Sequence, residues 1–96
     1  MRSDMSESAR ERLVDHVEAG PGGAMTDDVG VITGQLTVAT TPLGDGKAQI
    51  EIQYAQADEW YTLTGSPAPV PPSGLKALHR DVLERVRRGD GAEAPR

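Results

Sequence analysis

Two stretches in the middle of the chain alternate between apolar and polar residues. Residues 31–40 read VITGQLTVAT, and residues 48–56 read AQIEIQYAQ. Neighbouring side chains of a strand point to opposite faces, so each stretch predicts a strand with one buried face. Between them, the pair Asp45-Gly46 supplies the positive φ angles of a tight turn. The pattern predicts an antiparallel hairpin whose core-facing residues are Ile32, Leu36, Val38, Ile50, Ile52 and Tyr54.

A third alternating segment and a proline-rich connection follow the hairpin. Residues 60–65, WYTLTG, come after the short turn QADE and predict a third antiparallel strand. Residues 66–72, SPAPVPP, cannot form a helix or a central strand, because Pro lacks the backbone N–H. They predict an extended, semi-rigid connector.

A helical pattern stands at each end of this β-structure. Residues 6–20 contain a Ser-x-x-Glu capping box at Ser8 and Glu11, repeat apolar residues every three or four positions and stop at Gly20. Residues 74–88 predict a second helix, with Ser73 as its cap and Gly89 as its end. The apolar face of this second helix comprises Leu75, Leu78, Val82 and Val86.

These elements predict a single α+β domain over residues 1–96 with the order α-β-β-β-α. The expected architecture is a three-stranded antiparallel meander with two helices packed on one face, because a sheet with one apolar face needs cover there. Residues 1–5 and 90–96 are expected to be flexible ends. The pattern does not distinguish Met1 from Met5 as the native start.

The composition narrows the classes of partner and compartment. A formal net charge of −5 argues against nucleic acid and anionic membranes as partners, because both need a positive protein surface. No apolar run approaches the length of a membrane span, and the N-terminus lacks the basic and apolar regions of a signal peptide. The absence of Cys favours the cytoplasm. The preference for Arg over Lys, with abundant Ala, Gly and Pro, is typical of a GC-rich bacterial genome.

The predicted element order also occurs in the double-stranded-RNA-binding domain. That domain reads the shape and the phosphates of RNA and needs basic residues near the start of its last helix. The corresponding place in this chain has Lys76 and Arg80 but no basic cluster. The shared order is therefore topology alone, and we expect no nucleic-acid binding.

Candidate catalytic and metal-binding residues are few. His16 and His79 lie on separate predicted helices without the spacing of a metal pair, so a solvated helix surface is the better interpretation of both. Asp27 and Asp28 lie in a polar loop but lack the alternating oxygen ligands of a calcium loop. We therefore expect no catalytic residue, no metal site and no cofactor.

Two further motifs have simple structural interpretations. Pro69 and Pro72 have the PxxP spacing of a ligand for an aromatic groove, but a plain connector between strand and helix explains them better. Arg85, Arg87 and Arg88 could bind an anion, whereas their place at the end of a helix complements its dipole. We favour the structural interpretation of each motif.

Trp60 and Tyr61 are adjacent, so in a strand only one of the two enters the core. Leu63 shares a face with Tyr61, which predicts that Tyr61 is buried and Trp60 points outward. A Trp60 that folds over the sheet edge, or is itself in the core, is also compatible with the sequence. The predicted outer face is polar and nearly uncharged, and such a surface with an aromatic anchor is typical of protein interfaces. Its residues are Trp60, Thr62, Thr33, Gln35, Thr37, Gln49 and Gln53, with Glu51 as the one charge.

The sequence therefore predicts a non-enzymatic protein–protein interaction or regulatory module that forms a homodimer through this face. Small chains often gain stability by oligomerising. The alternative is a small-molecule-binding domain or small enzyme with a pocket between sheet and helices. A pocket lined by His16 or His79 would favour the alternative, and a buried sheet face would favour the interaction module.

Overall fold

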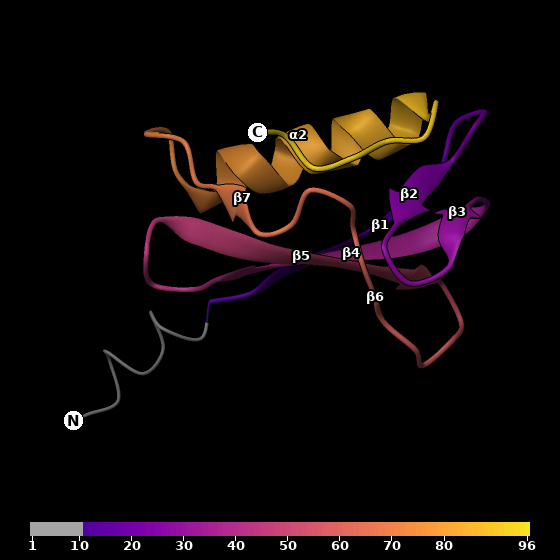
Figure 1. Ribbon diagram of the computed structural model, residues 1–96, viewed down its shortest axis with the longest axis horizontal. Coiled ribbons are helices and arrows are strands. Elements are labelled where there is room, and N and C mark those ends of the chain that lie inside the picture. The colour runs from indigo at the N-terminus through magenta and orange to yellow at the C-terminus, as the bar shows by residue number, and fades with distance from the viewer. Residues whose placement is uncertain (1–10) are drawn as a thin grey trace.

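A computed structural model describes residues 11–96, and this part of the chain contains seven strands and one helix (Figure 1). The elements are β1 (Leu13–Glu18), β2 (Ala24–Thr26), β3 (Gly30–Ile32), β4 (Gln35–Pro42), β5 (Lys47–Tyr54), β6 (Tyr61–Thr62), β7 (Ala68–Pro69) and α2 (Leu75–Arg88). The fold is α+β with an antiparallel sheet, as the sequence predicts. The finer prediction, a three-stranded meander with two helices, is wrong.

β4 and β5 form the centre of the main sheet. They pair antiparallel with Val38 opposite Ile52, and residues 43–46 connect them. In this connection the Asp45 carboxylate accepts a hydrogen bond of 3.1 Å from the Lys47 backbone N–H, and Gly46 has a φ of 84°. The predicted hairpin at Asp45-Gly46 is therefore confirmed.

The other strands extend the main sheet on both sides of this hairpin. β1 pairs with β4 at one edge, with Val17 opposite Leu36. At the other edge, β6 pairs with one end of β5 and β7 with the other end. The third strand that the sequence predicts over residues 60–65 is thus present but only two residues long, and the proline-rich connector includes the short edge strand β7.

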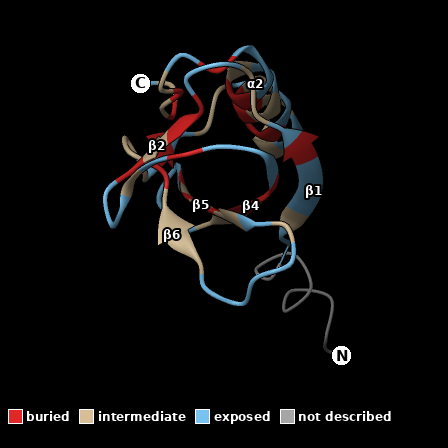
Figure 2. Ribbon diagram, turned by 90° about the vertical axis from the view of Figure 1, so that its right-hand side faces the viewer, coloured by how far each residue is buried: buried red, intermediate tan, exposed pale blue. Residues whose placement is uncertain are grey.

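The cover on one face of the main sheet comes from three segments. α2 packs on β1 and β4. Beside it lie the small β2–β3 hairpin and the chain after the helix, which are joined by a bridge between Ala24 and Ala92. Viewed along the long axis, the sheet curls from β1 through β4 and β5 to β6, and β2 and α2 close the opposite side (Figure 2).

The connection between β1 and β2 lies against the end of α2. The Gly20 N–H donates to the carbonyl of Val86 at 3.0 Å, and the Asp90 N–H donates to the carbonyl of Pro21 at 2.6 Å. Gly20 must be Gly, because a Cβ there would lie 2.6 Å from the Arg88 carbonyl oxygen. This contact joins the connection after β1, residues 20–23, to the end of α2 and the segment after it, residues 86–92.

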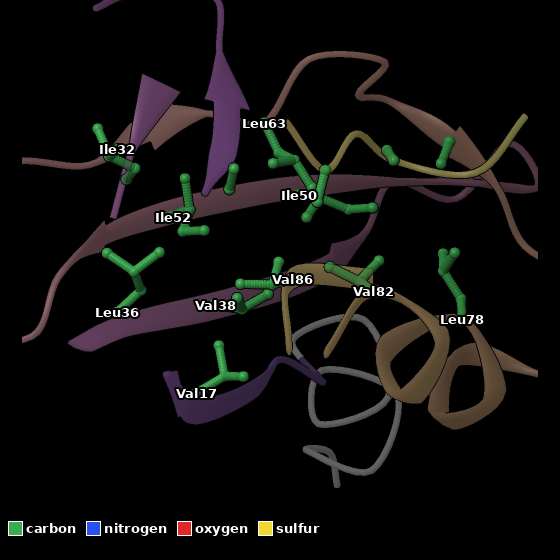
Figure 3. Close-up of a cluster of buried hydrophobic side chains, with 14 of the residues drawn as sticks. Val17, Ile32, Leu36, Val38, Ile50, Ile52, Leu63, Leu78, Val82 and Val86 are labelled. Carbon is green, nitrogen blue, oxygen red and sulfur yellow. The ribbon is translucent and has the colours of Figure 1, made fainter. Parts of the chain in front are cut away.

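The core is aliphatic, because the chain has no Phe and its single Trp is only half-buried. Side chains from β1, β3, β4, β5 and α2 converge in it, together with Leu63 from the segment after β6 (Figure 3). The apolar face predicted for the last helix is confirmed, since α2 buries Leu78, Val82 and Val86. The main buried side chains are Val17, Ile32, Leu36, Val38, Ile50, Ile52, Leu63, Leu78, Val82 and Val86.

The first predicted helix is wrong where the structure describes it. Residues 13–18 of the predicted 6–20 form β1, and residues 6–10 lie outside the described part of the chain. Leu13 and Val17 are four positions apart, and this spacing places two side chains on one face both of a helix and of a strand. Pairing with β4, a contact that the local pattern does not contain, selects the strand.

Four smaller expectations differ from the structure. Gly34 has a φ of 89° and divides the predicted strand 31–40 into β3 and β4. Tyr54, expected in the core, ends β5 and is 42% exposed. Gly74 rather than Ser73 caps α2, without a side-chain hydrogen bond. The segment 90–96, for which the sequence predicts a flexible end, packs on the fold and buries Ala92 and Ala94.

Candidate functional site

The face of the main sheet that points away from α2 is the first candidate site, and we call it the outer face. No described helix or strand covers it (Figure 1). The strand registers define its rows, in which His16, Thr37 and Gln53 are neighbours across β1, β4 and β5. Its strand residues are Val14, His16, Glu18, Gln35, Thr37, Ala39, Thr41, Lys47, Gln49, Glu51, Gln53, Thr62 and Pro69.

The middle of the outer face is built from small side chains. Ala39 has no exposed area and Thr37 is 4% exposed. His16 Nδ1 and the Thr37 hydroxyl share a hydrogen bond of 2.9 Å. Val14, by contrast, is 45% exposed. The accessible part of the face therefore lies on its two sides, along β1 and along β5 and β6.

Trp60 stands at the β6 side of the outer face. Tyr61 lies opposite Ile52 and therefore faces the core, whereas Thr62 lies opposite Glu51 on the outer face. The Arg12 guanidinium carbon is 5.2 Å from the centre of the Trp60 ring, which is the geometry of a cation–π contact. The ring is half-buried in this position.

The structure brings together most, but not all, of the predicted interface residues. Trp60, Thr62, Gln35, Gln49 and Gln53 lie on the outer face and are half-buried or exposed. Thr37 lies there too but is buried beneath its neighbours.

Thr33 lies elsewhere, in the connection between β3 and β4 beside Gly23. Sequence reasoning missed Arg12, Val14 and His16, because it assigned their segment to a helix. The signal that could have found Val14 and His16 is the spacing of Leu13, Asp15 and Val17, which share one face of a strand and leave Val14 and His16 on the other.

Tyr61 faces the core at the edge of the sheet. Its hydroxyl donates to the Glu59 carboxylate at 3.5 Å, and the side chain is half-buried. Partial burial, and then the negative charge of Glu59, raise the pKa of Tyr61 above its ordinary value of 10.0. The phenol is therefore neutral at physiological pH.

A buried histidine forms the second candidate site. His79 on α2 is 5% exposed, and its Nε2 lies 2.8 Å from a carboxylate oxygen of Asp15 on β1. Its Nδ1 lies 2.7 Å from the hydroxyl of Thr40 on β4. Because a carboxylate only accepts, Nε2 carries a hydrogen, and a neutral ring then accepts the Thr40 hydroxyl at Nδ1. The expectation of a solvated His79 is wrong, and His16 lies on a strand rather than a helix.

The order carboxylate, imidazole, hydroxyl is that of an acid–base–nucleophile triad, but the burial is reversed. Thr40 has no exposed area, whereas the Asp15 side chain is 60% exposed. A nucleophile must reach its substrate, so this hydroxyl cannot act as one. A cavity of 240 Å³ beside the cluster is lined by Leu13, Asp15, Lys76, His79, Arg80 and Leu83. It is smaller than the roughly 300–1,000 Å³ of typical ligand pockets.

The remaining candidates from the sequence have structural roles. The Asp28 carboxylate accepts the Thr62 N–H at 2.8 Å, and Asp27 accepts the Thr64 hydroxyl at 2.8 Å. These bonds fasten the β2–β3 turn to the segment around β6. Within residues 11–96 no group of His, Asp and Glu could hold a metal ion.

Arg85, Arg87 and Pro69 likewise have structural roles. Arg85 pairs with Asp81 at 3.4 Å, and Arg87 pairs with Glu84 at 3.5 Å, all on the surface of α2. Pro69 belongs to β7, which pairs with β5. The PxxP motif is therefore partly built into a sheet edge.

Comparisons with family models, curated proteins and solved structures found no match for this chain. No described helix is long and apolar enough to cross a membrane.

Proposed function

We propose that the protein is a non-enzymatic protein–protein interaction module that forms a homodimer through its outer face, with Trp60 as the anchor. The observation that carries the proposal is a sheet face that no described helix or strand covers, and it combines mostly neutral polar side chains with the only Trp of the chain. Faces of this composition are typical of interface centres, where full charges are depleted and aromatic side chains are enriched.

The chemistry of the accessible residues supports this proposal. Thr62, Gln49 and Gln53 can form hydrogen bonds across an interface without the desolvation cost of full charges. Glu51 is half-buried beside Ala39 and Thr62, so a partner must place a cation or solvent against it. Lys47 of the second copy, which is exposed at the start of β5, has the required charge.

Light scattering over a concentration series tests the proposal, with Trp60→Ala as the variant. We expect a wild-type dimer at about 100 μM and a roughly 30-fold weaker dimer for Trp60→Ala, which corresponds to about 2 kcal/mol at an interface anchor. Tyr54→Ala is the matched control, because Tyr54 is an exposed aromatic on the opposite face. A wild type that stays monomeric contradicts the proposal, as does a Trp60→Ala dimer as strong as that of Tyr54→Ala.

The bacterial cytoplasm is the compartment that we propose for this module. The absence of Cys and the Arg-rich composition support it. The net charge of −5 supports a function without nucleic acid, and a salt-dependent shift of duplex RNA or DNA by micromolar protein would contradict it. Fractionation of a native host with an antibody against the protein tests the compartment.

A small-molecule site is the second candidate, and the cavity lined by His79 is the observation that favours it. Lys76 and Arg80 give its wall positive charge, whereas Asp15 adds a negative one. The occupied ring nitrogens of His79 and the small volume count against it. Titration with a panel of small carboxylates, followed by NMR shifts of the His79 ring, tests this candidate. Shifts that are absent in Lys76→Gln would support it.

A further inference from the structure

The outer edge of β1 carries backbone groups that no described residue pairs with. β1 is the last strand of the main sheet on its side. The Ala19 N–H donates to the Gly34 carbonyl at 2.9 Å, which fixes the hydrogen-bonded positions of the β1–β4 ladder. By the alternation of an antiparallel ladder, Leu13, Asp15 and Val17 bond to β4. The N–H and C=O groups of Val14 and His16 therefore point away from the sheet.

This edge lacks most of the features by which proteins block unwanted strand pairing. β1 is six residues long and contains neither Pro nor Lys. Val14 is 45% exposed in the middle of it. The inward-pointing charge, Asp15, is hydrogen-bonded to His79 at 2.8 Å.

From this geometry we infer that a second copy of the chain adds antiparallel along the edge of β1, so that the two main sheets form one continuous sheet. The inference extends the proposed self-association to a second surface, the β1 edge, which adjoins the outer face at the contact between Arg12 and Trp60. Both contacts are two-fold, so one contact alone gives a dimer. Both together give a tetramer where the two axes cross at right angles, and a longer chain of copies where they do not.

Charge complementarity selects the register. Residues whose backbone N–H and C=O groups point away from the sheet must lie opposite one another in the two copies. The two-fold axis between the copies then passes at Val14, Asp15 or His16. Only the axis at Asp15 places Arg12 opposite Glu18 of the second copy, and the symmetry forms this ion pair twice. The axes at Val14 and His16 leave no acid opposite Arg12. Opposite charges that face each other across two strands stabilise the pairing of those strands.

Positive side chains on the flank of α2 offset the negative charge of the two Asp15 carboxylates, which this register brings together at the two-fold axis. The two Asp15 side chains become neighbours there, each already bound to its own His79. Lys76 and Arg80 line the same cavity as Asp15 and supply positive charge around the pair.

The same flank completes the contact with apolar surface. Because α2 packs on β1 and β4, the two helices lie about 10 Å apart, which is a normal helix-packing distance. The half-buried Leu13 and Leu83 then fill the space between them.

Proline substitution at Val14 separates the edge contact from the stability of the monomer. The Val14 N–H does not bond to β4, so Val14→Pro leaves the ladder intact while it removes a donor and obstructs the added strand. We expect sedimentation analysis to show an association at least 10-fold weaker for Val14→Pro, with a native circular dichroism spectrum. Val14→Ala is the matched control and should keep at least half of the association. A Val14→Pro protein that associates like Val14→Ala overturns the inference.

Single cysteines test the register, because the chain has no Cys of its own. In the Asp15-centred register, two Asp15→Cys positions lie about 4.5 Å apart between Cα atoms, within disulfide range, whereas two Val14→Cys positions lie about 8 Å apart. Mild oxidation should therefore cross-link Asp15→Cys much more than Val14→Cys or the hairpin control Asp45→Cys. Cross-linking at Val14→Cys alone, or equal cross-linking at all three positions, overturns the register.

The same measurements distinguish this inference from the outer-face proposal. If Val14→Pro loses association and Trp60→Ala keeps it, the edge contact is supported and the outer-face contact is overturned. If Trp60→Ala loses association and Val14→Pro keeps it, the outer-face contact is supported and the edge contact is overturned. A wild-type tetramer that each variant reduces to a dimer supports both. A monomeric wild type overturns both.

Discussion

Thr40 holds a buried hydroxyl whose partner is the ring of His79, 2.7 Å away. Val has nearly the same shape as Thr but no hydroxyl, so Thr40→Val leaves His79 Nδ1 without a partner in the interior. Burying an unsatisfied polar group costs about 1–3 kcal/mol. We expect Thr40→Val to lower the free energy of unfolding by that amount in urea denaturation.

The neighbouring Thr41 provides the control for this substitution. It lies on the outer face, is half-buried and forms no side-chain hydrogen bond within the described residues. Thr41→Val should change stability by less than about 0.5 kcal/mol, as surface substitutions usually do. Equal effects of Thr40→Val and Thr41→Val would mean that the His79 contact contributes nothing.

Tyr61 makes the stability of the protein depend on pH in the alkaline range. Partial burial and the charge of Glu59 raise its pKa in the folded state above the ordinary value of 10.0. Above pH 10 the unfolded chain loses this proton first, so it binds fewer protons than the native state and stability falls as pH rises. Below that pH the contribution is fully present.

Tyr61→Phe removes this ionisation, and we expect its stability to decline less steeply than that of the wild type between pH 9.5 and about 11. Urea midpoints at several pH values measure the difference, with Tyr54→Phe as the control. Parallel stability curves for wild type and Tyr61→Phe would contradict the shifted pKa.

At the scale of elements, the sequence specified the features that depend on neighbours in the chain. The β4–β5 hairpin follows from alternation and from Asp45-Gly46, and α2 follows from Leu78, Val82 and Val86. β1 did not follow, because only pairing with β4 distinguishes its strand from a helix. The outer face was therefore predicted without its β1 side.

The cluster around His79 was beyond the sequence for a similar reason. Its three members come from β1, β4 and α2, and Asp15 and His79 are 64 positions apart. Once β1 is assigned to a helix, no local pattern places Asp15 beside His79. The docked segment 90–96 likewise depends on long-range backbone bonds, which a polar, glycine-containing tail does not indicate.

Gly46 and Gly20 are required for two different reasons: Gly46 has a left-handed backbone conformation, whereas Gly20 has no room for a Cβ. Gly46 has a φ of 84° with no heavy atom near its missing Cβ, so Gly46→Ala should cost about 1–2 kcal/mol of stability for the left-handed conformation. Gly20 has no positive φ, but a Cβ there meets the carbonyl groups of Arg87 and Arg88. Gly20→Ala should cost about 3 kcal/mol. Urea denaturation measures both, and a Gly46→Ala variant less stable than Gly20→Ala would contradict this assignment.

At the scale of the whole molecule, the chain after α2 ties the small hairpin to the main sheet. Ala92 accepts the Met25 N–H at 2.8 Å and donates to the Gly23 carbonyl at 2.9 Å, while Ala94 donates to the Thr64 carbonyl at 2.8 Å. A chain shortened after Gly91 loses these three bonds, each with a net contribution of about 1 kcal/mol.

We therefore expect this truncation to lower stability by about 3 kcal/mol and to speed hydrogen exchange at the Met25 amide. A chain shortened after Ala94 keeps all three bonds and is the control. If both truncated chains exchange at the wild-type rate, the segment does not stabilise the fold.

The contact between residues 20–23 and 86–92 also bears on how fast the protein folds. It joins positions nearly 70 residues apart, so a long loop must close before the Gly20–Val86 hydrogen bond forms, whereas the β4–β5 hairpin closes only four residues. We expect the hairpin in the transition state for folding and the long-range contact after it. In a chevron plot, Gly46→Ala should then slow folding, and Gly20→Ala should mainly accelerate unfolding. If Gly20→Ala slows folding instead, the contact between residues 20–23 and 86–92 forms early.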